Sequence, residues 1–471
     1  MTASKHDFII ITIILWLMCV SFVQSVEKEP KYAYATIHYE GTPQDDAYLL
    51  GIRVLIHSIK RSGTKHDIIV LVHDSVKEST RSILAQTGAK LVNVEPIENP
   101  FSKDDSRRAY YQARFDQTLI KLHVWNQLEY DRIIYMDADN VVLHNLDDLF
   151  LCGHFCAIFM NAVAFHTGLF VVKPDAEVYQ DMLAKLKAGM KSYDGADQGF
   201  LVSYFHDMEY APMFNSSAKK KSEDNMNRIP INYNMNHIYY YERCRWDVMY
   251  RRGQWANLEV PASSVGFPIA QAFKPWFWLP YYLFQVHWLW WSYRQQLGDD
   301  WTISFLAHLA FIFSLVAVVD WKFGSPKGER GFSRYMTWKM LGGSLLSIMI
   351  SCFIVFYYVP PLMPPPLALP LFGITQNLLL FGCFLRGVYI LCGYSVPSRA
   401  QLVTMAASSF FMQVLSFYVA TADFSNPVYK SWFGMLAIVA WIGTQAFYFI
   451  WKLPPNPFYA GDFVIPSHKA Q

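Results

Sequence analysis

The chain has 471 residues, a length that predicts two to three domain-sized units, and its formal net charge of +2 gives no reason to expect a nucleic-acid partner. Hydrophobic residues make up 53% of the chain, which also carries 15 Trp, 29 Tyr and 35 Phe, more than an ordinary soluble protein. Most charges come before about residue 260, and the long apolar runs come after residue 300. The simplest interpretation is a soluble half followed by a membrane half.

The N-terminus has the pattern of an export signal. Lys5 and His6 precede an apolar run from Phe8 to Val23, and small residues lead up to Ser25. Residues 1–25 are therefore predicted to be a signal peptide, with an uncleaved anchor as the alternative. Both interpretations place the following domain, residues 26–276, in the lumen.

Strand and helix patterns alternate through the soluble half. Short apolar runs predict buried strands, and apolar residues at helical spacing predict the segments between them as helices. The predicted strands are 32–37, 68–72, 90–94 and 132–136, and the predicted helices are 46–61, 76–87 and 113–128. This alternation favours an α/β fold with a parallel sheet and crossover helices. Ligands of such sheets bind beyond the carboxyl ends of the strands.

The second half has the pattern of a membrane region. Residues 277–302 are rich in Trp and Tyr, as at a membrane interface. About five transmembrane helices are predicted within 303–451, at 303–319, 338–358, 367–390, 403–420 and 432–451. The loop 320–339 carries five Lys or Arg residues, so it and the tail 452–471 are predicted to be cytosolic. Arg386 lies near the cytosolic end of its span and is expected to snorkel there.

The cysteine pattern fits an oxidising compartment. Cys152, Cys156 and Cys244 lie in the soluble half. A structural zinc site would need a second ligand pair, so a disulfide is favoured, with at least one of the three cysteines left unpaired. Asn215 opens the glycosylation sequon Asn-Ser-Ser, which predicts a lumenal, surface position.

The triplet Asp137-Ala138-Asp139 directly follows the predicted strand 132–136. Two carboxylates at such a strand end can hold a hard divalent cation that shares its other sites with a diphosphate. The alternative is a turn whose acids are only solvated.

Two further motifs carry polar groups suited to a ligand. Asp194-Gly-Ala-Asp197-Gln198-Gly199 sets acids between glycines, which allow close backbone approach, although Asp can also cap a helix there. Lys274-Pro-Trp276 holds a lysine that suits phosphate, or that anchors the chain at the membrane. Arg114 and Lys121 share one face of the predicted helix 113–128.

These motifs together resemble glycogenin and its relatives in glycosyltransferase family 8. The resemblance rests on Lys121 to Asp139, on His166-Thr-Gly-Leu-Phe-Val-Val-Lys-Pro174, on the Asp194 and Lys274 motifs, and covers about residues 32–276. The Cys152…Cys156 pair and the multi-span tail are similar to the plant glycogenin-like starch initiation proteins. Glucuronosyltransferase activity is proposed for that branch, and one member adds glucuronic acid to inositol phosphorylceramide.

The resemblance implies a GT-A nucleotide-diphospho-sugar transferase fold (Rossmann-like, mostly parallel) that uses a UDP-sugar and Mn²⁺ with retention of configuration. Asp137 and Asp139 would bind the metal, and Thr36, Ile37 and Tyr48 would lie against the uridine. The remaining implied donor-site residues are Arg114, Lys121, Ala138, Asp194, Asp197, Gln198 and Lys274. Of these, Lys121, Asp194, Asp197 and Gln198 are the catalytic candidates. Whether Asp197 attacks the anomeric carbon or orients the sugar stays open.

The chain departs from the family at one position of the metal site. The relatives supply a His a few residues before Lys-Pro-Trp, whereas residues 263–273 contain no His here. His237 and His287 do not match that position. We therefore expect metal binding that depends on the nucleotide and on water.

The resemblance implies an acceptor that is a lumenal glycan or glycolipid, with glucuronic acid or glucose as the donor sugar. It also implies a Golgi or other secretory-pathway membrane. The alternative is a membrane scaffold or transporter with a degenerate sugar domain. Against transport, the predicted spans show no repeat and one ionisable residue, Arg386.

Overall fold

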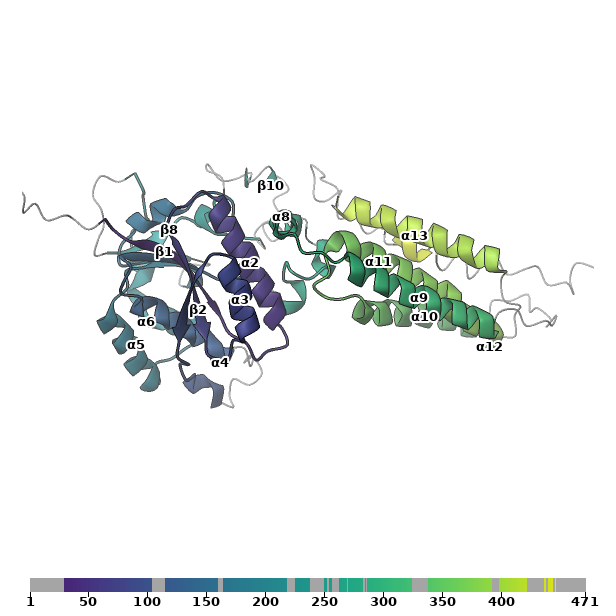
Figure 1. The fold of residues 1–471 in the computed structure, drawn as a ribbon, viewed down its shortest axis with the longest axis horizontal. Helices are drawn as coiled ribbons and strands as arrows, with labels where there is room; N and C mark the ends of the chain where they lie inside the picture. The colour runs from purple at the N-terminus through teal and green to yellow at the C-terminus, as the bar shows by residue number, and fades with distance from the viewer. Residues whose placement is uncertain are drawn as a thin grey trace, which may run out of the picture.

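A computed structural model of the chain has two parts, an α/β domain and a bundle of long helices that projects from it (Figure 1). It describes residues 29–103, 115–159, 164–217, 225–237, 250–251, 254–255, 262–268, 270–282, 284, 286–323, 338–391, 398–421, 436–437, 439–443 and 445. The predicted signal, Arg114, Cys244 and the tail 452–471 lie outside the described residues.

A seven-stranded sheet forms the centre of the α/β domain, in the order β3-β2-β1-β4-β7-β6-β8. Its strands are β1 (Tyr32–His38), β2 (Asp67–His73), β3 (Lys90–Val94), β4 (Arg132–Met136), β6 (Phe155–Phe159), β7 (Phe165–Val172) and β8 (Met226–Ile229). Strands β3, β2, β1 and β4 are parallel, and β7 is antiparallel to both β4 and β6. The predicted, mostly parallel α/β sheet is confirmed.

The sheet separates two hydrophobic layers, because successive side chains of a strand point to opposite faces. In β4, Ile133 and Tyr135 pack with Leu122 and Trp125 on one face. Ile134 and Met136 pack with the other layer, which includes Leu55. All of these side chains are buried. A strand covered on both faces explains the continuous apolar run that preceded the Asp-Ala-Asp triplet in the sequence.

Helices cover both faces of the sheet. They include α2 (Asp45–Arg61), α3 (Glu78–Gln86), α4 (Phe115–Thr118), α5 (Ala176–Lys187), α6 (Asp197–Tyr204) and the 3₁₀ segments η1 (Pro100–Lys103), η3 (Leu119–Asn126), η4 (Asp147–Leu151), η5 (His206–Tyr210) and η6 (Ile231–Tyr233). The predicted helix 113–128 is helical from 115 to 126 and ends two residues early, and most of it is the 3₁₀ segment η3. Residues 119–125 are buried on every side, so the segment lacks the solvent face of an ordinary amphipathic α-helix.

A small second sheet connects the end of β4 to a distant part of the chain. It consists of β5 (Asn140–Val142), β12 (Ser264–Gly266) and β9 (Met235–Asn236), with β12 in the middle. Gly266 pairs with Asn140, and the N–H of Phe267 donates to the carbonyl oxygen of Asp139 at 3.1 Å. This pairing brings residues 264–276 to the Asp-Ala-Asp turn, more than 120 residues away in sequence.

The second half of the chain is helical. After the two-residue strands β10 (Tyr250–Arg251) and β11 (Gln254–Trp255) come η7 (Gln271–Phe273), η8 (Leu279–Tyr282), α8 (His287–Arg294) and η9 (Gln295–Leu297). The bundle contains α9 (Thr302–Phe323), α10 (Trp338–Tyr358), α11 (Pro365–Leu379), the π-helical turn η10 (Leu380–Phe384), α12 (Leu385–Leu391) and α13 (Arg399–Thr421).

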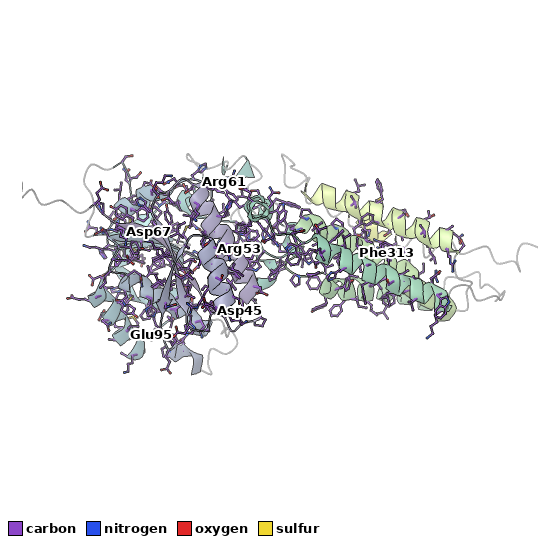
Figure 2. The ribbon with its side chains drawn as sticks, viewed as in Figure 1. Asp45, Arg53, Arg61, Asp67, Glu95 and Phe313 are labelled. Carbon is purple, nitrogen blue, oxygen red and sulfur yellow. A yellow bond between two sulfur atoms is a disulfide. The ribbon has the colours of Figure 1, made fainter. Side chains whose placement is uncertain are left out.

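Two of the described helical stretches, Thr302–Lys322 and Pro365–Val388, are long and apolar enough to cross a membrane, and Gly342–Tyr358 is apolar but shorter. The count of five spans therefore stays a prediction. Large apolar side chains point outward from the bundle, among them Phe313 on α9 (Figure 2), Phe353 on α10 and Phe411 on α13. Exposed apolar faces of this kind mark a surface that contacts lipid or another protein.

The expectation that Arg386 snorkels is wrong. Its side chain is buried, and its guanidinium forms an ion pair with Asp320 of α9. Arg399, at the start of α13, pairs with the same carboxylate at 2.8 Å. Helix packing therefore gives this arginine a carboxylate partner, which reduces the cost of burying its charge.

The favoured disulfide is present, between Cys152 and Cys156. It joins the end of η4 to β6, and both residues are buried. Asn215 lies in an exposed turn in which its side-chain oxygen accepts from the N–H of Ser217 at 3.0 Å. The position of Asn215 agrees with the predicted surface sequon, and its glycosylation stays a prediction.

Candidate active site

The Asp-Ala-Asp turn is fixed by main-chain hydrogen bonds at the carboxyl end of β4. The N–H of Asp137 donates to the carbonyl of Gly168 at 3.0 Å, and the side-chain amide of Asn140 donates to the carbonyl of Asp137 at 2.9 Å. Helix α2 packs directly on this turn at Gly51. A Cβ at residue 51 would lie 2.8 Å from the carbonyl oxygen of Ala138, so the close approach requires glycine.

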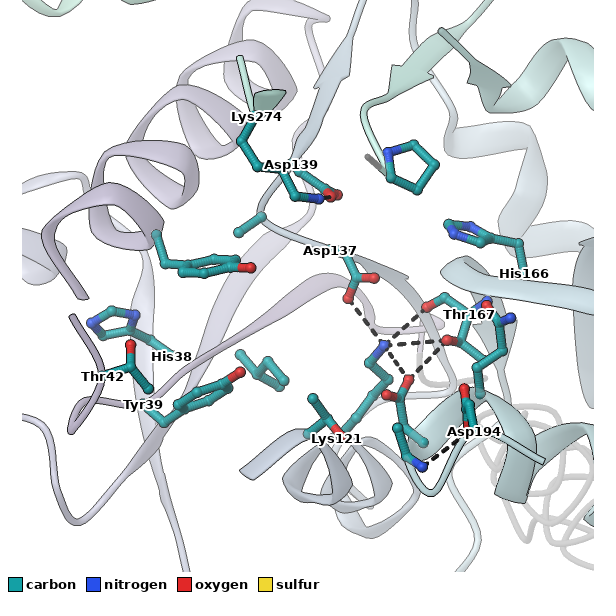
Figure 3. A pocket seen from close by; sticks show the side chains of 18 of the residues that line it. His38, Tyr39, Thr42, Lys121, Asp137, Asp139, His166, Thr167, Asp194 and Lys274 are labelled. Carbon is teal, nitrogen blue, oxygen red and sulfur yellow. Dashed lines mark hydrogen bonds and ion pairs between the residues drawn. The ribbon is translucent and has the colours of Figure 1, made fainter. Parts of the chain in front are cut away.

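A pocket of about 410 Å³ opens beyond the carboxyl ends of β1 and β4 (Figure 3). It brings together ten residues that the sequence singled out: Ile37, Tyr48, Lys121, Asp137, Ala138, Asp139, Asp194, Asp197, Gln198 and Lys274. Thr36 does not line it, because its side chain is buried within β1. Arg114 lies outside the described residues.

Lys121 is the centre of one group of charges in the pocket. Its ammonium lies 3.0 Å from Asp137 Oδ1 and 2.6 Å from Asp197 Oδ2, and it donates to the carbonyl of Thr167 at 3.2 Å. The Thr167 hydroxyl donates to Asp197 Oδ2 at 2.8 Å. The lysine comes from η3 and its partners from the turn after β4, from β7 and from α6, so one cation joins four segments (Figure 3).

Electrostatics keep this group ionised. Burial alone would lower the pKa of Lys121, but the charges of Asp137 and Asp197 hold it above its usual range. Burial also opposes ionisation of Asp197, yet the Lys121 ion pair and the hydrogen bond from Thr167 lower the pKa of that carboxyl. Asp197 is therefore a carboxylate at neutral pH.

Lys274 forms the second charged pair of the pocket. Its ammonium contacts Asp139 and donates to the carbonyl of Phe267 at 2.9 Å. Lys274 is 4% exposed, because the small second sheet carries its segment against the turn. Each carboxylate of the Asp-Ala-Asp triplet thus has its own lysine, Asp137 with Lys121 and Asp139 with Lys274.

Asp194 has a structural role as well as a place in the pocket. Its Oδ1 accepts from the N–H groups of Ala196 at 2.9 Å and Gly199 at 3.0 Å, and from the hydroxyl of Ser192 at 2.8 Å. A Cβ at residue 199 would come within 2.5 Å of that oxygen. Asp194 is therefore not the N-cap residue of α6, which is Ala196, but its carboxylate accepts from the N–H of Gly199 in the first turn of that helix and also lines the pocket.

The sequence reasoning missed several lining residues, namely His38, Tyr39, Thr42, Thr118, His166, Thr167, Ala196, Pro268 and Ala270. His166 is notable because its Nδ1 accepts from the N–H of Gly168 at 3.1 Å, which makes Nε2 the protonated nitrogen. A Cβ at residue 168 would lie 2.2 Å from the imidazole, so Gly168 makes room for the ring. The signal was present, since His166-Thr-Gly is part of a quoted motif.

A divalent cation fits the charges of this pocket. The lining holds four carboxylates (Asp137, Asp139, Asp194 and Asp197) and two ammonium groups, an excess of two negative charges. Burial lowers the pKa of His166 and of His38, to about 4 for His38, so both rings are neutral near pH 7. Oxygen ligands of this type suit Mn²⁺.

The protein alone offers an incomplete metal site. Among the residues that the structure describes, no three His, Cys, Asp or Glu side chains are grouped closely enough to hold a metal ion. His237 and His287 are fully buried and bind main-chain carbonyls, of Gly266 at 3.3 Å and of Phe273 at 2.9 Å. A metal ion bound by Asp137 and Asp139 would therefore need oxygen ligands from other groups.

The fold and the pocket define an α/β domain with paired acids and lysines at the carboxyl ends of its central strands. Residues 43–152 match glycosyl transferase family 8. This segment of the chain is therefore similar to glycosyltransferase family 8.

Three relatives from Arabidopsis thaliana show where the similarity extends. The chain is 37% identical to "Putative glucuronosyltransferase PGSIP8", over 60% of this chain and 54% of that one. It is 38% identical to "Putative glucuronosyltransferase PGSIP7", over 61% of this chain and 55% of that one. It is 29% identical to inositol phosphorylceramide glucuronosyltransferase 1, over 67% of this chain and 58% of that one. The chain thus spans little more than half the length of these relatives.

Solved structures of glycosyltransferases are more distant. The glycosyltransferase GlyE of Streptococcus pneumoniae is 18% identical, with a TM-score of 0.37 over 58% of this chain and 62% of that one. The galactosyltransferase LgtC is 17% identical, with a TM-score of 0.34 over 52% of this chain and 89% of that one.

Proposed function

We propose that the protein transfers glucuronic acid, with glucose as the second candidate, from a UDP-sugar to a lumenal glycan or glycolipid such as inositol phosphorylceramide. The transfer would retain anomeric configuration and use Mn²⁺. The observation that carries the proposal is the pocket, which joins the Asp-Ala-Asp turn to two buried lysines and keeps an excess of two negative charges. Relatives whose names specify glucuronosyl transfer support this choice of donor sugar.

Departure of UDP from the anomeric carbon is the chemical obstacle, because negative charge develops on the diphosphate. Mn²⁺ held by Asp137 and Asp139 would supply positive charge to the diphosphate oxygens. Lys274 donates to the same group once it leaves Asp139, and its buried position makes that charge effective. Ile37 and Tyr48, at the β1 side of the pocket, border the nucleotide.

The sugar end of the pocket is formed by Lys121, Asp194, Asp197 and Gln198. Asp197 is an ionised carboxylate held by Lys121 and Thr167, so it can accept sugar hydroxyls or meet positive charge at the anomeric carbon. The side-chain oxygen of Gln198 accepts from the N–H of Thr167 at 3.4 Å, and its amide donates to Tyr193. These contacts orient the Gln198 amide at the pocket wall.

Donor turnover is the direct test of the proposal. The full-length protein in lipid nanodiscs should release UDP from UDP-glucuronate in the presence of Mn²⁺ and lose that activity with EDTA. A higher rate with UDP-glucose would change the donor assignment but keep the class. No binding of UDP and no turnover of either sugar would overturn the proposal and favour a membrane scaffold with a degenerate sugar domain.

The second half of the chain is proposed to be a multi-pass region of a Golgi or other secretory-pathway membrane, with residues 26–276 in the lumen. The apolar side chains that point outward from α9, α10 and α13 support contact with lipid. In sealed vesicles, added protease should remove a tag placed after Gln471 and leave residues 32–276 intact. Protection of the tag would contradict the cytosolic tail and the five-span count.

A further inference from the structure

The segment 274–278 (Lys-Pro-Trp-Phe-Trp) runs from the pocket into the helical bundle. Lys274 contacts Asp139 in the pocket. Two residues on, Trp276 is fully buried against the α/β domain, with its ring 5.0 Å from that of Tyr48. Trp278 is buried on the other side of the junction, among Ile312 of α9 and Val355 of α10. Five consecutive residues therefore connect the proposed phosphate-binding lysine to the core of the bundle.

Arg294, the last residue of α8, holds this segment to the bundle. Its guanidinium donates through Nη1 to the carbonyl of Trp276 at 3.5 Å and through Nη2 to the carbonyl of Leu362. Leu362 lies in the loop 359–364, between α10 and α11. One side chain thus joins the main chain beside Lys274 to a loop of the bundle that is about 90 residues away in sequence.

The burial of Arg294 indicates that this connection is costly to form. The side chain is 2% exposed, and desolvation lowers its pKa. The charge of Asp299 opposes this lowering of the Arg294 pKa. However, Asp299 forms its ion pair with Arg53 of α2, at 2.9 Å (Figure 2). In the described part of the chain, no carboxylate pairs with Arg294, which is instead stabilised by main-chain carbonyls. A buried cation that bonds to both partners in this way fixes the position of the segment 274–278 relative to the loop 359–364.

Two further bonds hold the same segment. The hydroxyl of Tyr281 donates to the carbonyl of Pro275 at 2.7 Å, and the N–H of Trp278 donates to the carbonyl of Pro361 at 3.4 Å. Main-chain groups of residues 275, 276 and 278 are therefore all engaged. Lys274 is the first residue of the segment, so its direction depends on these contacts.

We propose that Arg294 is a positioning residue for the donor site: it fastens residues 274–278 to the loop 359–364, so that the helical bundle holds Lys274 at the donor diphosphate. The inference rests on the proposed function of Lys274. It implies that the bundle is a structural part of the donor site and that disturbing this end of the bundle weakens nucleotide binding. Misplacing a binding group by about 1 Å can cost up to 10²-fold in activity, so the effect should be measurable.

The test compares two buried arginines, Arg294 at the junction with the α/β domain and Arg386 at the far end of the bundle. Arg294→Gln in full-length protein should raise the Kd for UDP, measured by calorimetry with Mn²⁺ present, about tenfold. Arg294→Lys, which keeps the charge but reaches fewer carbonyls, should give a smaller rise. The matched control is Arg386→Gln, which removes the ion pair to Asp320 at the far end of the bundle and should lower Tm while the Kd for UDP stays unchanged.

The outcomes separate this inference from the proposed function. Equal UDP affinities in the Arg294 and Arg386 variants, with Tm lowered in both, would overturn the positioning role and leave the proposed function intact. Failure of the unaltered protein to bind UDP would overturn both. If Arg294→Gln does not fold, Tyr281→Phe removes a neighbouring contact more gently and should raise the Kd about threefold. An unchanged Kd in Tyr281→Phe and in Arg294→Lys would then contradict the inference.

Discussion

One group of paired charges lies in the pocket and another lies between bundle helices, and the two groups have excess charge of opposite sign. The pocket has four carboxylates and two lysines. The bundle group has one carboxylate, Asp320, and two arginines, Arg386 and Arg399. Both groups contain buried charges, yet of the two only the pocket group keeps excess negative charge that a cation could neutralise. The excess positive charge of the bundle group agrees with the cytosolic side predicted for it. The sign of the excess charge, more than burial, distinguishes a group of charges suited to bind a cation from one that only holds helices together.

Removing the buried cation of the pocket group should be far more severe than removing the exposed cation of the bundle group. Lys121→Met leaves Asp137 and Asp197 without their shared partner and should lower the free energy of unfolding by about 3–5 kcal/mol. Arg399→Gln removes the exposed partner of Asp320 and should cost less than about 1 kcal/mol. Thermal unfolding of both variants measures the difference. Equal losses would show that the pocket cluster contributes no more to stability than a surface ion pair.

Removing a carboxylate should lower donor turnover when it belongs to the pocket group and leave turnover unchanged when it belongs to the bundle group. Asp139→Asn keeps the shape of the side chain but weakens metal binding, so donor turnover should fall about 10²–10³-fold. Asp320→Asn should lower Tm and leave turnover unchanged. Both are measured as UDP released from the donor sugar, with circular dichroism to check folding. Full turnover in a folded Asp139→Asn variant would remove the metal assignment of this residue.

The pocket lysines should also compete with the metal. Because Lys274 occupies Asp139, Mn²⁺ should bind weakly without nucleotide and much more strongly once UDP draws Lys274 to its phosphates. Lys274→Met should therefore tighten Mn²⁺ binding without UDP by about tenfold and weaken UDP binding. Calorimetry of Mn²⁺ with and without UDP measures both effects. Tight Mn²⁺ binding to the unaltered protein alone, lost in His237→Ala or His287→Ala, would show that a histidine completes the site.

Acid should destabilise the protein through two buried histidines, His237 and His287. Burial lowers the pKa of His237 to about 4 and that of His287 to about 3, against an ordinary value of 6.5. The unfolded chain then binds more protons, so the stability that these rings contribute is complete above pH 6.5 and is lost as pH falls toward 4. Between pH 6.5 and 4, the free energy of unfolding of His237→Asn should fall less steeply with decreasing pH than that of the unaltered protein, by about 1 kcal/mol per pH unit, and its Tm should fall less steeply too. An unchanged pH profile of Tm in His237→Asn would contradict this account.

The parts that sequence could predict are those set by local pattern. Strand β4 and the Asp-Ala-Asp turn followed from one apolar run and the acids after it, and the ten lining residues came from motifs whose order matched a family. Arg294 could not be found in this way, because its partners, Trp276 and Leu362, lie in separate segments joined by packing. The partner of Arg386 was missed for the same reason. The 3₁₀ form of η3 depends on burial from every side, which helical periodicity does not reveal.

His166 and Thr167 show a different limit. Both stand in strand β7, where polar residues are common at strand ends, and neither type indicates a ligand by itself. Their role depends on Gly168, whose missing side chain leaves space for the imidazole, and on Asp197 reaching Thr167 from α6. Close packing of this kind is decided by neighbouring atoms rather than by residue pattern.

The Cys152–Cys156 bridge sets a practical condition on how the protein can be made. Both sulfurs belong to residues that are at most 1% exposed, and β6, where Cys156 lies, is an interior strand of the main sheet. A bacterial cytosol would keep these thiols reduced during synthesis, and the closed core would then exclude oxidants added after lysis. Recombinant production should therefore pass through a eukaryotic secretory pathway, where oxidation accompanies folding and the sequon at Asn215 is also accessible to the glycosylation machinery.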